Sequence, residues 1–186
     1  MTQSTPSPQK FQKVGLPEGH AYPELAYHLP TGSILAHTRP VEPGLPGRRL
    51  SLWRVAETRY HPIGDFALSI SVESFVLHPQ LPLLYFITYV WSEHSNGPTG
   101  GNWEALHCFN LNTFQCEIVA RRGELIPPDD YCKAWLNELF LVGDDGNTLF
   151  CKAGLRNGEP VQYCLSKLSV SDRKLEIVSR LEAVFA

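Results

Sequence analysis

A threefold internal repeat constrains the fold of this chain more than any other feature of its sequence. Three strand-like segments, LSLWRV, LHCFNL and YCLSKL, begin at Leu50, Leu106 and Tyr163, which are 56 and 57 residues apart. A hairpin-like segment precedes each of them, and a turn with a further strand-like segment follows: RYHPI, QCEIVAR and KLEIVSRL. A period of this length, with four short strands in each copy, is typical of proteins built from repeated β-meanders.

The repeat predicts an all-β chain of three tandem four-stranded antiparallel β-meanders, over residues 20–64, 68–122 and 132–182. Runs such as PLLYFITYVW are rich in aromatic and β-branched residues, and no long segment has the apolar period of an amphipathic helix. We therefore expect at least about ten strands and no helix longer than about two turns. The meanders would form one β-repeat domain over residues 20–186, behind a disordered N-terminal tail over residues 1–19.

Two of the copies end in nearly the same way. FNLNTFQCEIVARR and SKLSVSDRKLEIVSR share a hydrophobic strand, a polar turn and an E-I-V strand. In this ending the chain resembles the β-propeller proteins, most nearly the TolB-like kind, over residues 20–182, and the resemblance carries over no catalytic residues. Closed propellers have four to eight blades, whereas three copies are present here. The chain would then be a partial propeller, half of a six-bladed ring closed by a homodimer, or an irregular barrel or sandwich.

A glycine-rich insertion between the second and third strands of the middle copy is the candidate site. The segment WSEHSNGPTGGNW places Glu93 beside His94 and is bracketed by Trp91 and Trp103. The pattern favours a long exposed turn in which the two tryptophans pair across the strand ends. Insertions on a rigid scaffold also carry function, so the tryptophans could stack on a sugar or a peptide, with Glu93 and His94 as polar contacts. These four residues are the predicted ligand- or partner-binding residues.

The other reactive residues show no catalytic or metal-binding pattern. The seven histidines lack the spacings HxH, HxxxH and HExxH, and the motifs GxSxG and GxGxxG and the P-loop are absent. His107 and Cys108 are neighbours in a strand and point to opposite faces, so they cannot form a dyad, and His107 is expected on a solvated face. The pairs Asp129–Asp130 and Asp144–Asp145 are typical of turns. No metal, cofactor or catalytic residue is predicted.

The five cysteines are predicted to be free thiols. Their number is odd, and no CxxC or CxC pair is present, so neither a disulfide framework nor a zinc site is indicated. Cys108, Cys151 and Cys164 lie within strand-like runs and are expected to be buried. Cys116 and Cys132 lie beside turns and are expected to react with thiol reagents.

Charge and hydropathy exclude several function classes. The net charge is −3, from 16 basic and 19 acidic residues, which gives no electrostatic case for nucleic acid or an anionic membrane. No apolar run approaches the roughly 20 residues of a membrane-spanning helix. The N-terminal segment has no apolar core of a signal peptide, so a cytoplasmic protein is expected.

The sequence favours a non-enzymatic binding or scaffolding protein, whose propeller-like surface recruits a protein partner or a second copy of the chain. A small hydrolase or lyase of the propeller class, acting on a carbohydrate or a peptide, is the first alternative. A subunit that is stable only within a larger assembly is the second.

Overall fold

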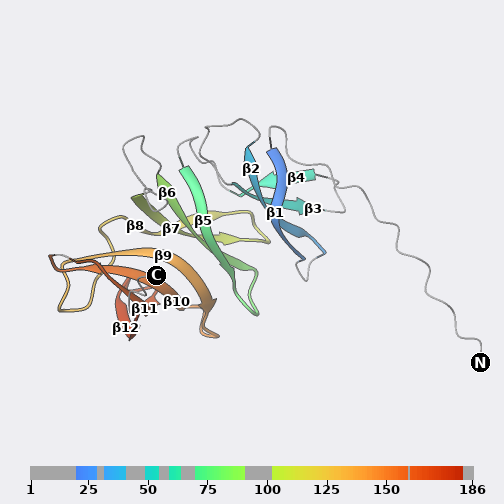
Figure 1. The fold of residues 1–186 in the computed structure, drawn as a ribbon. Coiled ribbons are helices and arrows are strands. Elements are labelled where there is room, and N and C mark those ends of the chain that lie inside the picture. The colour runs from blue at the N-terminus through green and yellow to red at the C-terminus, as the bar shows by residue number, and fades with distance from the viewer. Residues whose placement is uncertain are drawn as a thin grey trace, which may run out of the picture.

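The part of the chain described by the computed structural model consists of β-strands and turns, and it contains no helix. It comprises residues 20–28, 32–40, 49–54, 59–63, 70–90, 102–158 and 160–181. We call its sheets the N-terminal sheet (β1–β4), the middle sheet (β5–β8) and the C-terminal sheet (β9–β12). In Figure 1 the middle sheet lies between the other two.

In each sheet, strands that follow one another in the sequence are hydrogen-bonded neighbours and run antiparallel. The N-terminal sheet, of which mainly the backbone is described, contains β1 (His20–His28), β2 (Ile34–Pro40), β3 (Arg49–Arg54) and β4 (Arg59–Pro62). The middle sheet contains β5 (Ile70–Leu77), β6 (Leu83–Val90), β7 (Asn102–Asn110) and β8 (Cys116–Arg121). The C-terminal sheet contains β9 (Lys133–Val142), β10 (Thr148–Arg156), β11 (Gln162–Ser169) and β12 (Leu175–Arg180).

The expectation of an all-β chain with four-stranded antiparallel sheets is confirmed. The closure of these sheets into a propeller, alone or as a dimer, stays a prediction. The predicted tail over residues 1–19 lies outside the described residues.

Both faces of the middle sheet are buried. Along β6 the side chains alternate, so that Tyr85 and Ile87 belong to the core shared with the C-terminal sheet. Leu84 and Phe86 belong to a second core that includes Ile63, the residue that follows β4. This double burial explains why β6 is a continuous apolar run in the sequence rather than an alternating one.

Side chains of the middle sheet bind the backbone of the C-terminal sheet directly. The hydroxyl of Tyr85 donates to the carbonyl of Gly146 at 3.0 Å, and that of Tyr89 donates to the carbonyl of Leu136. On β5, the hydroxyl of Ser74 accepts a hydrogen bond from the amide of Leu139 at 3.0 Å. These bonds fix the register of one sheet against the other, and they place β5 beside β9.

The turn between β9 and β10 has the predicted chemistry. The Asp145 carboxylate accepts hydrogen bonds from the amides of Asn147 and Thr148, at 3.0 and 2.9 Å. Together with a bond from the Thr148 hydroxyl, these contacts lower the pKa of Asp145. Gly146 has a φ of 66°, a conformation that glycine adopts without steric cost. The pair Asp144–Asp145 therefore belongs to a hairpin turn, as expected.

The expectation that His107 lies on a solvated face is wrong. Only 8% of the residue is exposed, and its ring stacks on that of Phe86 with centroids 4.8 Å apart. Its Nε2 lies 3.0 Å from the hydroxyl oxygen of Thr88. Burial, with a smaller effect of the positive charge of Arg121, lowers the pKa of His107 to about 4. The physical reason is the second core, because alternation along β7 directs each side chain into one buried layer or the other.

All five cysteines are free thiols, as predicted. Cys151 and Cys164 are buried, Cys116 and Cys132 are exposed, and Cys108 is only half-buried rather than buried. Burial raises the pKa of Cys151 to about 12. Desolvation, with smaller effects of Cys108 and Glu117, raises the pKa of Cys116 to about 11. The Sγ of Cys116 lies 3.9 Å from Nδ1 of His107.

We expect a thiol reagent to label Cys132 first under native conditions, because the thiolate is the reactive form and it is scarce at Cys116. Cys151 and Cys164 should be labelled only when the protein unfolds. Peptide mapping after timed alkylation measures the order. Labelling of Cys151 as fast as that of Cys132 would contradict the burial of β10.

Candidate binding site

A pocket of about 470 Å³ lies where the middle and C-terminal sheets meet. The residues that line it come from the end of β6, the start of β7, the turn after β8, the start of β9, the end of β10 and the start of β11. In an antiparallel meander the last residues of the even-numbered strands and the first residues of the odd-numbered strands lie at the same end of the sheet. The pocket therefore lies at one end of the two sheets, beside the loops that connect the strands.

Aromatic side chains line the pocket from both sheets. Tyr89 and Trp103 are register partners on β6 and β7. Trp135 and Tyr163 come from β9 and β11, and both pair with Gly154 on the strand between them. A Cβ atom on Gly154 would lie 2.2 Å from Cε2 of Trp135, so the indole lies directly against the glycine backbone. The absent side chain at this position is what makes room for the indole ring.

Among the residues that the structure describes, the charged ones that line the pocket are all basic. Arg122 follows β8, Lys133 begins β9 and Arg156 ends β10. Arg122 and Lys133 are exposed, and Arg156 is half-buried and donates from Nε to the carbonyl of Gly158 at 3.0 Å. Among the residues that the structure describes, no aspartate or glutamate lines this pocket.

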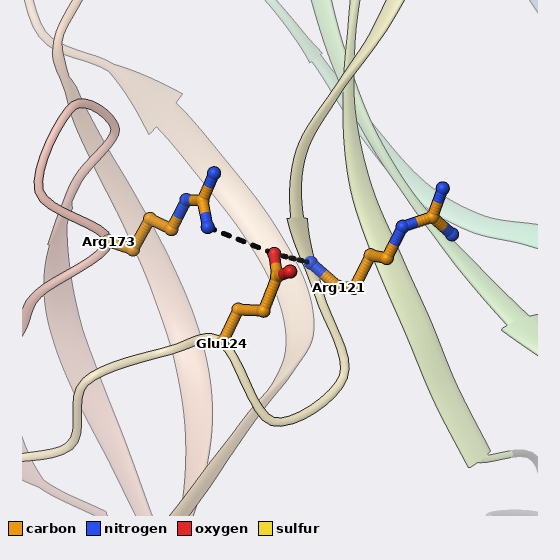
Figure 2. A network of polar contacts seen from close by, with 3 residues as sticks. All are labelled: Arg121, Glu124 and Arg173. Carbon is orange, nitrogen blue, oxygen red and sulfur yellow. Dashed lines mark hydrogen bonds and ion pairs between the residues drawn. The ribbon is translucent and has the colours of Figure 1, made fainter.

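The linker between β8 and β9 forms part of the pocket wall and is held on both sides (Figure 2). The Glu124 carboxylate accepts a hydrogen bond from the amide of Arg121 at 2.9 Å and one from the guanidinium of Arg173 at 3.1 Å. Arg173 lies in the turn before β12, so this carboxylate joins the two sheets. Ile126 then pairs in parallel with Lys174 as an isolated bridge. These contacts fix the backbone on either side of Leu125, which is buried and lines the pocket.

Two polar atoms of the pocket residues are buried without a hydrogen-bond partner. They are Nε1 of Trp103, a residue only 3% exposed, and Oδ1 of Asn137. A buried donor or acceptor without a partner costs about 1–3 kcal/mol of stability. Five such side-chain atoms occur among the described residues, and the pocket has two of them.

Of the four residues predicted to bind a ligand or partner, the structure describes Trp103 alone. It lies in β7, buried, on the pocket wall. Trp91, Glu93 and His94 belong to residues 91–101, which lie outside the described residues. The predicted pairing of Trp91 with Trp103 is therefore untested, and the partner of Trp103 in the described register is Tyr89.

Sequence reasoning missed the contribution of the C-terminal sheet. Trp135, Tyr163 and Arg122 were not among the predicted binding residues, but they line the pocket. The position of these residues in the strands was an available signal. Each lies at or beside the terminus of a strand, and an antiparallel meander brings these termini to the same end of the sheet as Trp103.

Comparison of the chain with protein-family models gives no match, and comparison with curated proteins gives none. Within the described ranges, no group of three or more histidine, cysteine or acidic side chains is placed to hold a metal ion. Nor is there, in the same residues, a helix that has the length and apolar character needed to cross a membrane.

Proposed function

We propose that this chain is a non-enzymatic binding or scaffolding protein that holds a protein partner in the pocket between its middle and C-terminal sheets. The observation that carries the proposal is the aromatic lining of this pocket, to which Tyr89 and Trp103 contribute from the middle sheet and Trp135 and Tyr163 from the C-terminal sheet. An extended peptide would place one side chain in the pocket while its backbone lies along the strand ends.

The aromatic walls of the pocket supply affinity for a side chain of the partner. Trp and Tyr are enriched among the residues that contribute most of the binding energy of protein–protein interfaces, and such residues lie in desolvated pockets. Trp103 and Trp135 approach the pocket from different sheets, so a side chain of the partner would be held between them. A volume of about 470 Å³ lies within the usual range of ligand pockets.

The architecture supports a partial propeller as the scaffold. In a propeller, the first strands of successive blades lie side by side around the central axis, and here β5 lies beside β9. The sheets would act as rigid blades, and the pocket would lie in the groove between two of them. Free thiols agree with the reducing compartment of a cytoplasmic protein, which is where we propose that it acts.

A displayed library of random peptides, selected against the purified chain, tests the proposal. The selected peptides are synthesised, and their affinities for the wild type and two variants are measured by calorimetry. Trp103→Phe replaces the indole in the pocket wall by a smaller ring and should weaken binding by about tenfold or more. Its stability should change by less than about 1 kcal/mol, because the loss of packing offsets the removal of an unsatisfied donor.

Tyr85→Phe is the matched control. It removes a hydroxyl that has a partner, the carbonyl of Gly146, from the same interface but away from the pocket. This variant should lose about 1 kcal/mol of stability and keep its affinity for the peptides. If Trp103→Phe binds the selected peptides as tightly as the wild type, the pocket is not the binding site and the proposal fails.

A further inference from the structure

The charge around the pocket is opposite to that of the chain as a whole. The chain has more acidic than basic residues, 19 against 16, yet the charged residues that line the pocket in the described part of the chain are Arg122, Lys133 and Arg156. Clefts lined by one sign of charge concentrate ligands of the other sign. The pocket therefore favours an anionic group, against the background of the whole chain.

The nearest acidic side chain on the linker is already engaged. Glu124 lies two residues after Arg122, but its carboxylate is directed at the amide of Arg121 and the guanidinium of Arg173 (Figure 2). No ion pair of Arg122 or Lys133 is found with the residues that the structure describes. The positive charge of these two side chains is thus available to a ligand.

The uncharged part of the pocket selects a second feature of the ligand. Four aromatic rings of the described residues line it, and the indole of Trp135 lies against the backbone of Gly154. Rings of this kind pack best against another aromatic side chain, offset-stacked or edge-to-face. A carboxylate at the basic rim and a ring between the aromatic walls would use both parts of the pocket at once.

We infer that the anchor of the protein partner is an acidic peptide segment in which aspartate or glutamate flanks an aromatic residue. The inference rests on the proposed function and specifies its partner. The carboxylate pairs with Arg122 and Lys133, and the ring packs between Trp103 and Trp135.

Three capped peptides test this inference: Gly-Glu-Phe-Glu-Gly, the same peptide with glutamine for glutamate, and the same with lysine. The acidic peptide should bind the full chain at least about tenfold more tightly than the glutamine peptide, as measured by calorimetry. Its affinity should fall when the salt concentration rises from about 50 to about 500 mM, because exposed charges are screened. The affinity of the glutamine peptide should not change with the salt concentration.

Two variants locate the effect. Arg122→Gln and Lys133→Gln should each weaken the acidic peptide several-fold, by about threefold or more, and leave the glutamine peptide unchanged. Arg121→Gln is the matched control, because it removes the same charge from the adjacent exposed residue, which does not line the pocket. Arg121→Gln should bind the acidic peptide as the wild type does.

The outcomes separate the inference from the proposed function. Equal binding of the acidic and glutamine peptides, or tighter binding of the lysine peptide, overturns the inference. If Trp103→Phe then binds these peptides more weakly than the wild type does, the pocket is still a peptide site and the proposed function stands. Digalacturonate, an acidic disaccharide, is the sugar probe. If the pocket binds it but none of the peptides, and Trp103→Phe binds it more weakly, the pocket is a sugar site, and the inference and the proposed function are both overturned. Binding of none of these probes overturns the inference, and a peptide from the random library then decides the proposed function.

Discussion

Between pH 6.5 and pH 4 the protein is expected to lose on the order of 3 kcal/mol of its free energy of unfolding because of His107 alone. Burial lowers the pKa of this residue to about 4 in the folded state, with a smaller effect of Arg121, whereas an unfolded histidine titrates near 6.5. Above pH 6.5 the imidazole is neutral in both states. As the pH falls through this window the unfolded chain binds a proton first, so the folded state is destabilised, and the loss levels off below about pH 4.

Urea unfolding of the wild type and His107→Leu at several pH values isolates this contribution. The variant cannot titrate at this position, and the Thr88 hydroxyl keeps a second acceptor, the carbonyl of Ala105 at 3.4 Å. The variant should be less stable than the wild type at pH 7 and should lose less stability on acidification. Equal losses in the two proteins would show that His107 is not held neutral by the fold.

Gly154→Ala is expected to destabilise the protein by about 1–3 kcal/mol, although alanine is the smallest possible addition. The new Cβ would lie 2.2, 2.4 and 2.6 Å from three atoms of the Trp135 indole, closer than any non-bonded contact allows. The indole must move, and because it lines the pocket, the affinity for the selected peptides should fall as well. Denaturant unfolding and calorimetry measure the two effects.

The double variant Gly154→Ala, Trp135→Leu tests the cause. With the indole removed, the methyl group has space, so Gly154→Ala should cost much less in the Trp135→Leu background than in the wild type. A double-mutant cycle that shows simple additivity would mean that the indole and the glycine do not restrict each other.

The strands were predictable because their signals are local. A run of aromatic and β-branched residues predicts β6, and the residues Asp145 and Gly146 are enough to predict the hairpin turn. The burial of His107 was not predicted, because alternation along a strand shows that there are two faces but not how many of them are covered. The continuous apolar run of β6 was the available sign that both faces are buried.

The site was predictable only in part, for a different reason. Trp103 was found because it borders a conspicuous insertion. Trp135, Tyr163 and Arg122 have no local peculiarity, and they become neighbours only when the faces of two sheets pack together. Such a site depends on the angle and register between the sheets. These are determined by the hydrogen bond that Tyr89 donates and the one that Ser74 accepts, and no spacing along the chain encodes them.

The bridge between Ile126 and Lys174 has a consequence for the order of assembly. It joins the inter-sheet linker to the last strand of the following sheet, so it is a contact of long sequence separation, which forms late in folding. On a growing polypeptide the linker can dock only after Leu175, whose amide donates to the carbonyl of Ile126, has been synthesised. The pocket would thus form after most of both sheets had formed, and incompletely synthesised chains would lack it.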